Sequence, residues 1–174
     1  MSVGAARPAR AFFALWPDRP TALALAAWQP AGAPPVRVED LHLTIAFLGA
    51  VDTTALAALA LDLSCPSFDL RLVRSEYWAA PRVQVALPQV VPAALLALRA
   101  QLCARLVAAG AWRADDRPFR PHVTLTRAGA ASGGGPLPAV DWHARALTLA
   151  VSDPVPDGPR YRRLATLPFA PAAG

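Results

Sequence analysis

Residues 41–49 read LHLTIAFLG and residues 120–127 read RPHVTLTR. Both stretches contain a histidine, an apolar residue, a threonine and a second apolar residue in the same order. The chain has three histidines and eight threonines among its 174 residues, so coincidence explains this repeat poorly. Alternating apolar residues with many strand formers predict that each stretch is a β-strand.

The two faces of these strands are expected to differ. Side chains alternate along a strand, so His42 and Thr44 should lie on one face, with Leu43, Ile45 and Phe47 on the other. The second strand repeats the arrangement. If the two halves of the chain pack around a pseudo-two-fold axis, both histidine–threonine pairs converge on one cleft.

This pattern favours acid–base catalysis at a phosphate. One of His42 and His122 can be neutral and accept a proton while the other is charged and donates one. The hydroxyls of Thr44 and Thr124 can donate hydrogen bonds to anionic oxygens. Such a centre needs neither a carboxylate nor a metal. A single histidine on a strand is often structural, and His143, which has no threonine two residues later, is expected to be structural or on the surface.

Nearby side chains add candidate substrate contacts. Arg120 has the same parity as His122, and Arg127 ends the same strand. Either arginine can place a fixed charge beside a phosphate or simply point to solvent. Phe12 or Phe13 can offer a face on which a base stacks, whereas the other belongs to the core because neighbours in a strand face opposite ways.

Apolar spacing along the rest of the chain predicts an α+β fold. Strands are expected at 10–16, 41–48, 67–77, 82–88, 122–127, 142–152 and 160–168, helices at 20–29, 53–63 and 91–109, and a flexible linker at 128–138. The order is β-α-β-α-β followed by β-α-β-β-β. We therefore expect one bilobal domain over 1–174: two pseudo-symmetric lobes of antiparallel sheet that share strands, with helices on the outer faces and a central cleft.

Composition limits the functional classes. The net charge is +5, with 17 arginines and no lysine. This charge suits either a solvated surface or attraction to phosphates and nucleic acid. No run approaches the roughly 18 apolar residues of a membrane helix. The apolar stretch from Ala11 to Trp16 is shorter than the ~7–15 residues of a signal peptide, so no membrane and a cytoplasmic location are expected.

Cofactors and assembly are expected to be simple. Cys65 and Cys103 lack the spacing of a metal or redox site, and we expect two reduced thiols, no cofactor and no metal. A chain of this length buries about 70% of its unfolded surface and needs no disulfide to fold. Short helices without heptads argue against a coiled coil, and a monomer is expected.

The paired motifs in their contexts resemble the 2H phosphoesterases. Within that group, the resemblance is closest to the RNA 2′,3′-cyclic phosphodiesterases, also named 2′-5′ RNA ligases. It covers most of the chain, through the segments RAFFALW, LHLTIAFLG, PRVQVAL, FRPHVTLTR and YRRLATLPF. The strand at 82–88 departs from the family in lacking a tryptophan.

The resemblance implies metal-independent hydrolysis of an RNA or nucleoside 2′,3′-cyclic phosphate to a 2′-phosphomonoester. It implies that His42 donates a proton to the leaving O3′, that His122 activates water, and that Thr44 and Thr124 hold the non-bridging oxygens. The residues alone do not assign donor and acceptor, because the motif is nearly symmetric. The expected substrates are RNA ends or cyclic nucleotides. The alternative is an RNA-binding protein that joins 2′-5′ RNA in the same cleft, as the arginine-only basicity suggests.

Overall fold

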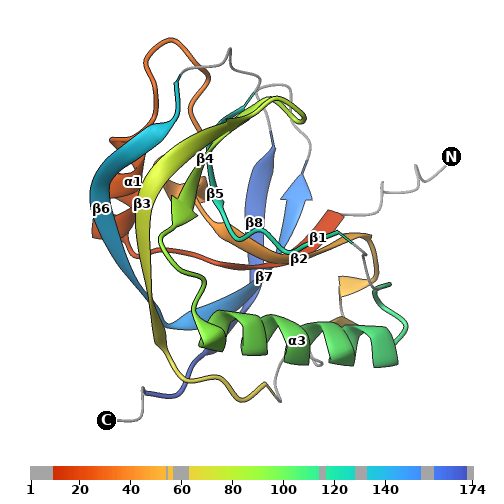
Figure 1. Cartoon of the computed structure of the whole chain (residues 1–174). Coiled ribbons are helices and arrows are strands. Elements are labelled where there is room, and N and C mark those ends of the chain that lie inside the picture. Colours follow the sequence, from red (N-terminus) through yellow and green to blue (C-terminus); the bar gives the residue numbers. More distant parts are fainter. Residues whose placement is uncertain are drawn as a thin grey trace, which may run out of the picture.

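One curled antiparallel sheet dominates the computed structural model, which describes residues 10–53, 55–56, 63–113, 117–127, 133–153 and 159–171 (Figure 1). Its strands are β1 (Arg10–Leu15), β2 (Leu43–Ala50), β3 (Phe68–Trp78), β4 (Val83–Pro88), β5 (Val123–Arg127), β6 (Gly135–Ala144), β7 (Ala146–Asp153) and β8 (Arg160–Pro168). The helices described in full are α1 (Arg19–Ala26), α3 (Ala93–Ala108) and the short 3₁₀ helix η1 (Val38–Asp40). The strand order is β6-β3-β4-β5-β2-β1-β7-β8.

The helices begin and end where local chemistry directs. The Asp18 carboxylate caps α1 by accepting from the Thr21 backbone N–H at 3.0 Å, which satisfies a donor that the first turn leaves free. Helix α3 buries one stripe of four leucines at helical spacing: Leu95, Leu98, Leu102 and Leu106. The helix stops before Gly110, which has a φ of +67°. Residues with a side chain adopt this backbone conformation less readily.

The sheet divides into two similar halves at its centre. We call β2, β1, β7 and β8 the first half-sheet, and β5, β4, β3 and β6 the second half-sheet. Each contains a strand, a helix and then a strand that begins directly after a motif histidine: β1-α1-β2 and β4-α3-β5. The pairing of Leu43 with Val123 joins the halves. The predicted α+β fold with two pseudo-symmetric parts is therefore confirmed.

The main core lies on the sheet face opposite the histidines. Leu25 of α1 and the leucines of α3 join Leu43, Ile45, Val123 and Leu125 in one buried cluster. Burial of these apolar side chains fixes the orientation of both central strands. The residues that alternate with them therefore face the opposite side of the sheet.

The structure corrects which strands belong together. β3 forms a hairpin with β4 in the second half-sheet rather than belonging with the N-terminal half. The C-terminal strand β7 returns to pair with β1 in the first half-sheet, and β8 pairs with β7 at the edge of the sheet. β3 lies in the second half-sheet because strands that are neighbours in the sequence usually pair with each other, as β3 and β4 do.

Two expected elements also differ from those observed, and most of a third lies outside the described residues. The expected strand 142–152 is two strands, because the chain turns at Arg145 between β6 and β7. The expected linker 128–138 is strand from Gly135 onward, paired with β3; residues 128–132 lie outside the described residues. Of the expected helix 53–63, only residues 53, 55, 56 and 63 are described, and the first three are helical.

Candidate active site

The two histidine strands meet side by side at the centre of the sheet. Leu43 pairs with Val123 in an antiparallel register, in which the residue before one member lies opposite the residue after the other. Each histidine therefore lies opposite the threonine of the other strand: His42 opposite Thr124, and Thr44 opposite His122. Because directly opposed residues share a face, the structure brings both pairs together on the face away from the main core.

Both imidazoles are held in the same way. His42 Nδ1–H donates to the Asp40 carbonyl at 2.6 Å, and His122 Nδ1–H donates to the Arg120 carbonyl at 2.7 Å. A carbonyl only accepts, so each hydrogen bond fixes the proton on Nδ1. Each Nε2 is left with its lone pair, ready to exchange a proton.

Each histidine strand carries a β-bulge at the same motif position. Between β1 and β2 the register skips Ile45 and, farther along, Leu48; between β4 and β5 it skips Leu125. The shared bulge is the one at Ile45 and Leu125. Both residues stand three positions after the histidine. A bulge adds an unpaired residue and reverses the alternation beyond it, so the residues that follow turn to the opposite face from the one a regular strand would give.

The bulge overturns the predicted face of Phe47. This side chain is 48% exposed and lines the same cavity as His42 and Thr44, instead of facing the core with Ile45. Arg127, also five residues after its histidine, reaches that cavity by the equivalent bulge.

Side chains from the helical segments satisfy the bulged backbone. Arg99 Nε of α3 donates to the Ile45 carbonyl at 3.3 Å. Gln29 Nε2, just after α1, donates to the Leu125 carbonyl at 3.0 Å, which also accepts from the Val36 N–H at 2.9 Å. Each half therefore supplies a polar side chain that supports the bulge of the other half.

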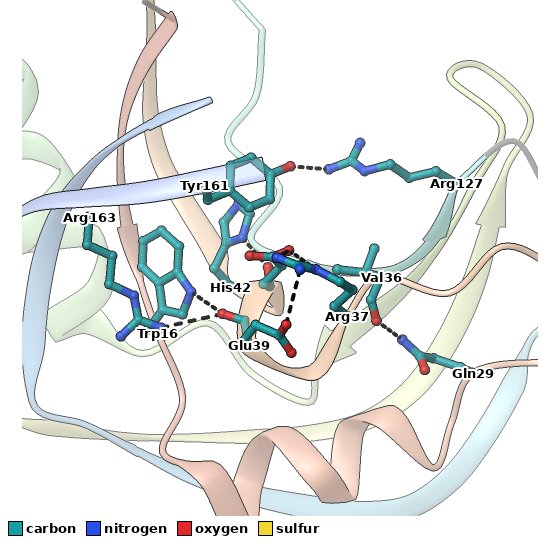
Figure 2. A network of polar contacts seen from close by, with 10 residues as sticks. Trp16, Gln29, Val36, Arg37, Glu39, His42, Arg127, Tyr161 and Arg163 are labelled. Atoms are coloured by element: carbon teal, nitrogen blue, oxygen red, sulfur yellow. Dashed lines mark hydrogen bonds and ion pairs between the residues drawn. The ribbon is translucent and has the colours of Figure 1, made fainter. Parts of the chain in front are cut away.

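A cavity of about 300 Å³ opens beside His42. Its lining combines aromatic, hydroxyl and guanidinium groups: Arg10, Phe12, His42, Thr44, Phe47, Arg127, Ser152, Pro159 and Tyr161. Arg127 Nη2 donates to Tyr161 Oη at 2.9 Å, so this guanidinium is held in place (Figure 2). Its charge lowers the pKa of both His42 and His122, and it therefore acts on both imidazoles.

Aromatic rings enclose His42. The ring centroids of Phe12, Trp16 and Tyr161 lie 5.1, 4.8 and 4.8 Å from that of the imidazole. Phe12 is thus the member of its pair on the cavity side, whereas Phe13 belongs to the main core. Burial lowers the pKa of His42 to about 4; the Asp40 carbonyl opposes this shift, and the charges of Arg127, His122 and Arg163 add to it.

A polar network fixes the segment before His42 (Figure 2). Trp16 Nε1 and Arg163 Nη2 both donate to the Glu39 carbonyl, at 3.2 and 3.4 Å. The buried Asp40 carboxylate is paired with Arg37 at 2.7 Å. The carbonyl that orients His42 is therefore part of a rigid turn.

Sequence reasoning missed Arg10 and Ser152, which line the cavity, and also Trp16, Tyr161 and Arg163 beside His42. Trp16 lies an even number of residues after Phe12 in the same stretch, so parity could have indicated it. Tyr161 and Arg163 lie on β8, and only the pairing of β8 with β7 brings them close.

His122 has a different environment. Its ring lies 4.5 Å from that of Trp78. Arg120 stacks over Trp78 at 4.4 Å and pairs with Glu76 at 3.3 Å, and it does not line the cavity that contains Arg127. Burial lowers the pKa of His122, and the charges of Arg120 and Arg127 lower it further. Sequence reasoning gave no signal for Trp78 or Glu76.

Other residues of interest stand apart from the cavity. His143 Nδ1 lies 2.6 Å from an Asp69 carboxylate oxygen across β3 and β6, on the surface, where this histidine was expected. Cys65 and Cys103 are free thiols, and burial raises the pKa of both. Among the described residues, no three histidine, cysteine or acidic side chains gather to hold a metal ion. Within the same ranges, no helix is long and apolar enough to cross a membrane.

Comparison with known proteins adds independent information. The family described as the 2′-5′ RNA ligase superfamily matches residues 17–150. The RNA 2′,3′-cyclic phosphodiesterase of Escherichia coli (strain K12) is 32% identical over 145 residues, which cover 78% of this chain and 81% of that protein. The crystal structure of E. coli LigT with 3′-AMP has a TM-score of 0.83 and 30% identity over 93% of this chain and 98% of that one. A Thermus thermophilus protein, TT0787, has a TM-score of 0.79 and 26% identity, covering 94% of this chain and 100% of its own.

Proposed function

The chain belongs to the 2′-5′ RNA ligase superfamily, in agreement with the resemblance of its two motifs, and we propose that it is an enzyme that hydrolyses 2′,3′-cyclic phosphates of RNA ends or nucleotides. The observation that carries this proposal is the pair of opposed histidine–threonine couples, joined through Leu43 and Val123. An in-line reaction at phosphorus needs one proton acceptor and one proton donor on opposite sides, and this arrangement supplies both.

The proposed chemistry follows the family assignment. His122 accepts a proton at Nε2 from water as the water oxygen attacks phosphorus. The P–O3′ bond breaks, and His42 donates its Nε2 proton to O3′, which leaves a 2′-phosphomonoester. Thr44, Thr124 and Arg127 hold the non-bridging oxygens. Fixed positive charge and two imidazoles can carry these steps, so we propose that the reaction is independent of a metal.

The protonation states support a substrate-linked mechanism. In the free site, burial and neighbouring charges lower the pKa of both histidines. An anionic phosphate placed between them opposes the charge of Arg127 and favours the imidazolium form. Binding of substrate therefore raises the pKa of His42 and generates the proton donor where it is used.

The first test is hydrolysis of adenosine 2′,3′-cyclic phosphate in excess chelator. We expect His42→Ala and His122→Ala each to reduce kcat/KM by about 10²–10⁴-fold, the usual contribution of a general acid or base. His143→Ala is the matched control and should retain wild-type activity. Wild-type turnover in both variants would contradict the proposed function, whereas loss of wild-type activity in chelator would contradict only metal independence.

RNA joining is the second candidate, favoured by the stacked pair of Arg120 and Trp78 beside His122. On that side a 5′-hydroxyl can replace water: its oxygen attacks phosphorus and its proton goes to His122, while the P–O3′ bond breaks and His42 protonates O3′, which leaves a 2′-5′ linkage. Incubation of fragments with 2′,3′-cyclic phosphate and 5′-hydroxyl ends, followed by gel analysis, tests this reaction.

The cytoplasmic location and the monomeric state stay predictions from the sequence.

A further inference from the structure

Arg10 stands at the far end of the cavity from the histidine–threonine pairs. It shares a face of β1 with Phe12, which touches His42, and lies two residues farther along, roughly 7 Å at the usual strand rise. Across the sheet Arg10 pairs with Ser152, and Ser152 pairs with Tyr161. One row of the first half-sheet thus presents a guanidinium, a hydroxyl and a phenol to the cavity.

The charge of Arg10 has no acidic partner within the part of the chain that the structure describes. Its guanidinium lies 5.2 Å over the Phe47 ring. Five other arginines of the sheet and its connections are each paired with a carboxylate: Arg37, Arg71, Arg74, Arg120 and Arg162. Arg10 is therefore available to an anionic ligand that enters the cavity.

Arg10 and Arg127 serve different positions. The charge of Arg127 lowers the pKa of both motif histidines. Arg10 is not among the charges that shift the pKa of either one. The reacting phosphate is therefore placed beside Arg127 rather than beside Arg10. A volume of about 300 Å³ lies at the small end of ligand cavities and suits a single nucleoside between the two arginines.

We propose that Arg10 and Ser152 form a second phosphate subsite, which binds the phosphodiester on the 5′ side of the terminal nucleotide. This inference rests on the proposed function and specifies its substrate class. A substrate with a 5′-phosphate engages both arginines, whereas a nucleoside 2′,3′-cyclic phosphate engages only Arg127. The enzyme therefore prefers the ends of RNA chains, or nucleotides with a 5′-phosphate, over cyclic phosphates of free nucleosides.

Three substrates separate the contributions. They are adenosine 2′,3′-cyclic phosphate, the same compound with a 5′-phosphate, and a dinucleotide that ends in a 2′,3′-cyclic phosphate. For the wild-type protein we expect kcat/KM to be about tenfold higher for the second and third substrates than for the first, as one added charge-assisted contact gives. Arg10→Gln should reduce this ratio toward one. Arg19→Gln, an exposed arginine at the start of α1, is the matched control and should keep the wild-type ratio.

Salt provides an independent readout. In the wild-type protein, log kcat/KM for the dinucleotide should fall with log salt more steeply than in Arg10→Gln, by about 0.7 in slope for one phosphate contact on a single strand. Equal slopes, or a substrate ratio that survives in Arg10→Gln, would overturn the inference. A gain that only the dinucleotide shows would overturn it too, since the second nucleoside would then be the recognised group.

The outcomes keep this inference separate from the proposed function. Hydrolysis of adenosine 2′,3′-cyclic phosphate that depends on His42 and His122, with no effect of Arg10→Gln on the ratio, would reject the subsite alone. Failure of the wild-type protein to hydrolyse any of the three substrates would reject the proposed function.

Discussion

The two histidines directly precede strands of the same design but lie in different surroundings. Each strand carries the bulge at the same motif position, and each imidazole donates to a carbonyl two residues earlier. His42 lies among three aromatic rings beside a cavity of about 300 Å³. His122 touches one ring, and an exposed arginine–glutamate pair stands next to it.

This difference shows how a repeated motif acquires two roles. The backbone fixes the position and tautomer of both imidazoles equally. Burial, ring contacts and nearby charges then set the protonation of each one separately. In the free site these surroundings lower the pKa of both imidazoles, so the proton that His42 donates in the proposed reaction depends on the bound phosphate. Four experiments probe the two surroundings separately.

The largest expected effect comes from the arginine that both histidines share. Arg127→Gln should lower kcat/KM for a 2′,3′-cyclic nucleotide by about 10²–10³-fold, because it removes a preorganised positive charge at the phosphate. Arg120→Gln should cost less than about tenfold, since Arg120 is exposed and bound to Glu76 on the His122 side. Steady-state kinetics of both variants test this, and equal losses would contradict the distinction between shared and one-sided charge.

The second effect is on stability. The folded-state pKa of His42 is about 4, below the ordinary 6.5, so the unfolded chain binds more protons between these values. The contribution that neutral His42 makes to the free energy of unfolding is fully present above pH 6.5 and is lost as pH falls through 4. Between pH 7 and pH 4, the difference in unfolding free energy between the wild type and His42→Asn should decrease by roughly 2 to 3 kcal/mol. Urea titrations that give the same difference at both pH values would contradict the buried, neutral state of His42.

A smaller effect separates the two tryptophans. Trp16→Leu removes a ring stacked on His42 and a donor to the Glu39 carbonyl. We expect kcat to fall about tenfold, because a small displacement of the imidazole misplaces the proton that it transfers. Trp78→Leu removes a tilted contact with His122, the ring under Arg120 and a donor to Glu76, but no contact that holds the carbonyl orienting His122, and it should change kcat by less than about threefold. The ratio of the two kcat values tests whether the aromatic enclosure positions His42 in particular.

The smallest effect isolates one charge. Arg163 stacks on Trp16 at 4.8 Å and lowers the pKa of His42, but it is not among the charges that shift His122. Arg163→Gln should raise the pKa of His42 and leave the titration of His122 in place. With three histidines in the chain, NMR titration of the imidazole protons resolves each one. A common shift of both would contradict separate electrostatic surroundings.

The sequence predicted the motif strands and their core face, but not the bulges. Leu43, Val123 and the leucines of α3 lie where periodicity places them, because burial enforces that periodicity. Phe47 was misplaced because a bulge changes the alternation without a local composition signal. Tyr161 and Arg163 were missed for another reason: they reach His42 only through a strand pairing between distant parts of the chain.

The return of β7 and β8 to the first half-sheet bears on the order in which the protein can fold during its synthesis. The four strands of the second half-sheet come from one stretch, 68–144, and can pair as that stretch leaves the ribosome. β1 is made first, yet the edge that carries Arg10 has no partner until Ser152 has been added. An apolar strand with an open edge can pair with the wrong chain. We therefore expect nascent chains that stop before β7 to aggregate. The side of the cavity that β8 contributes beside His42 should be the last part of the molecule to form.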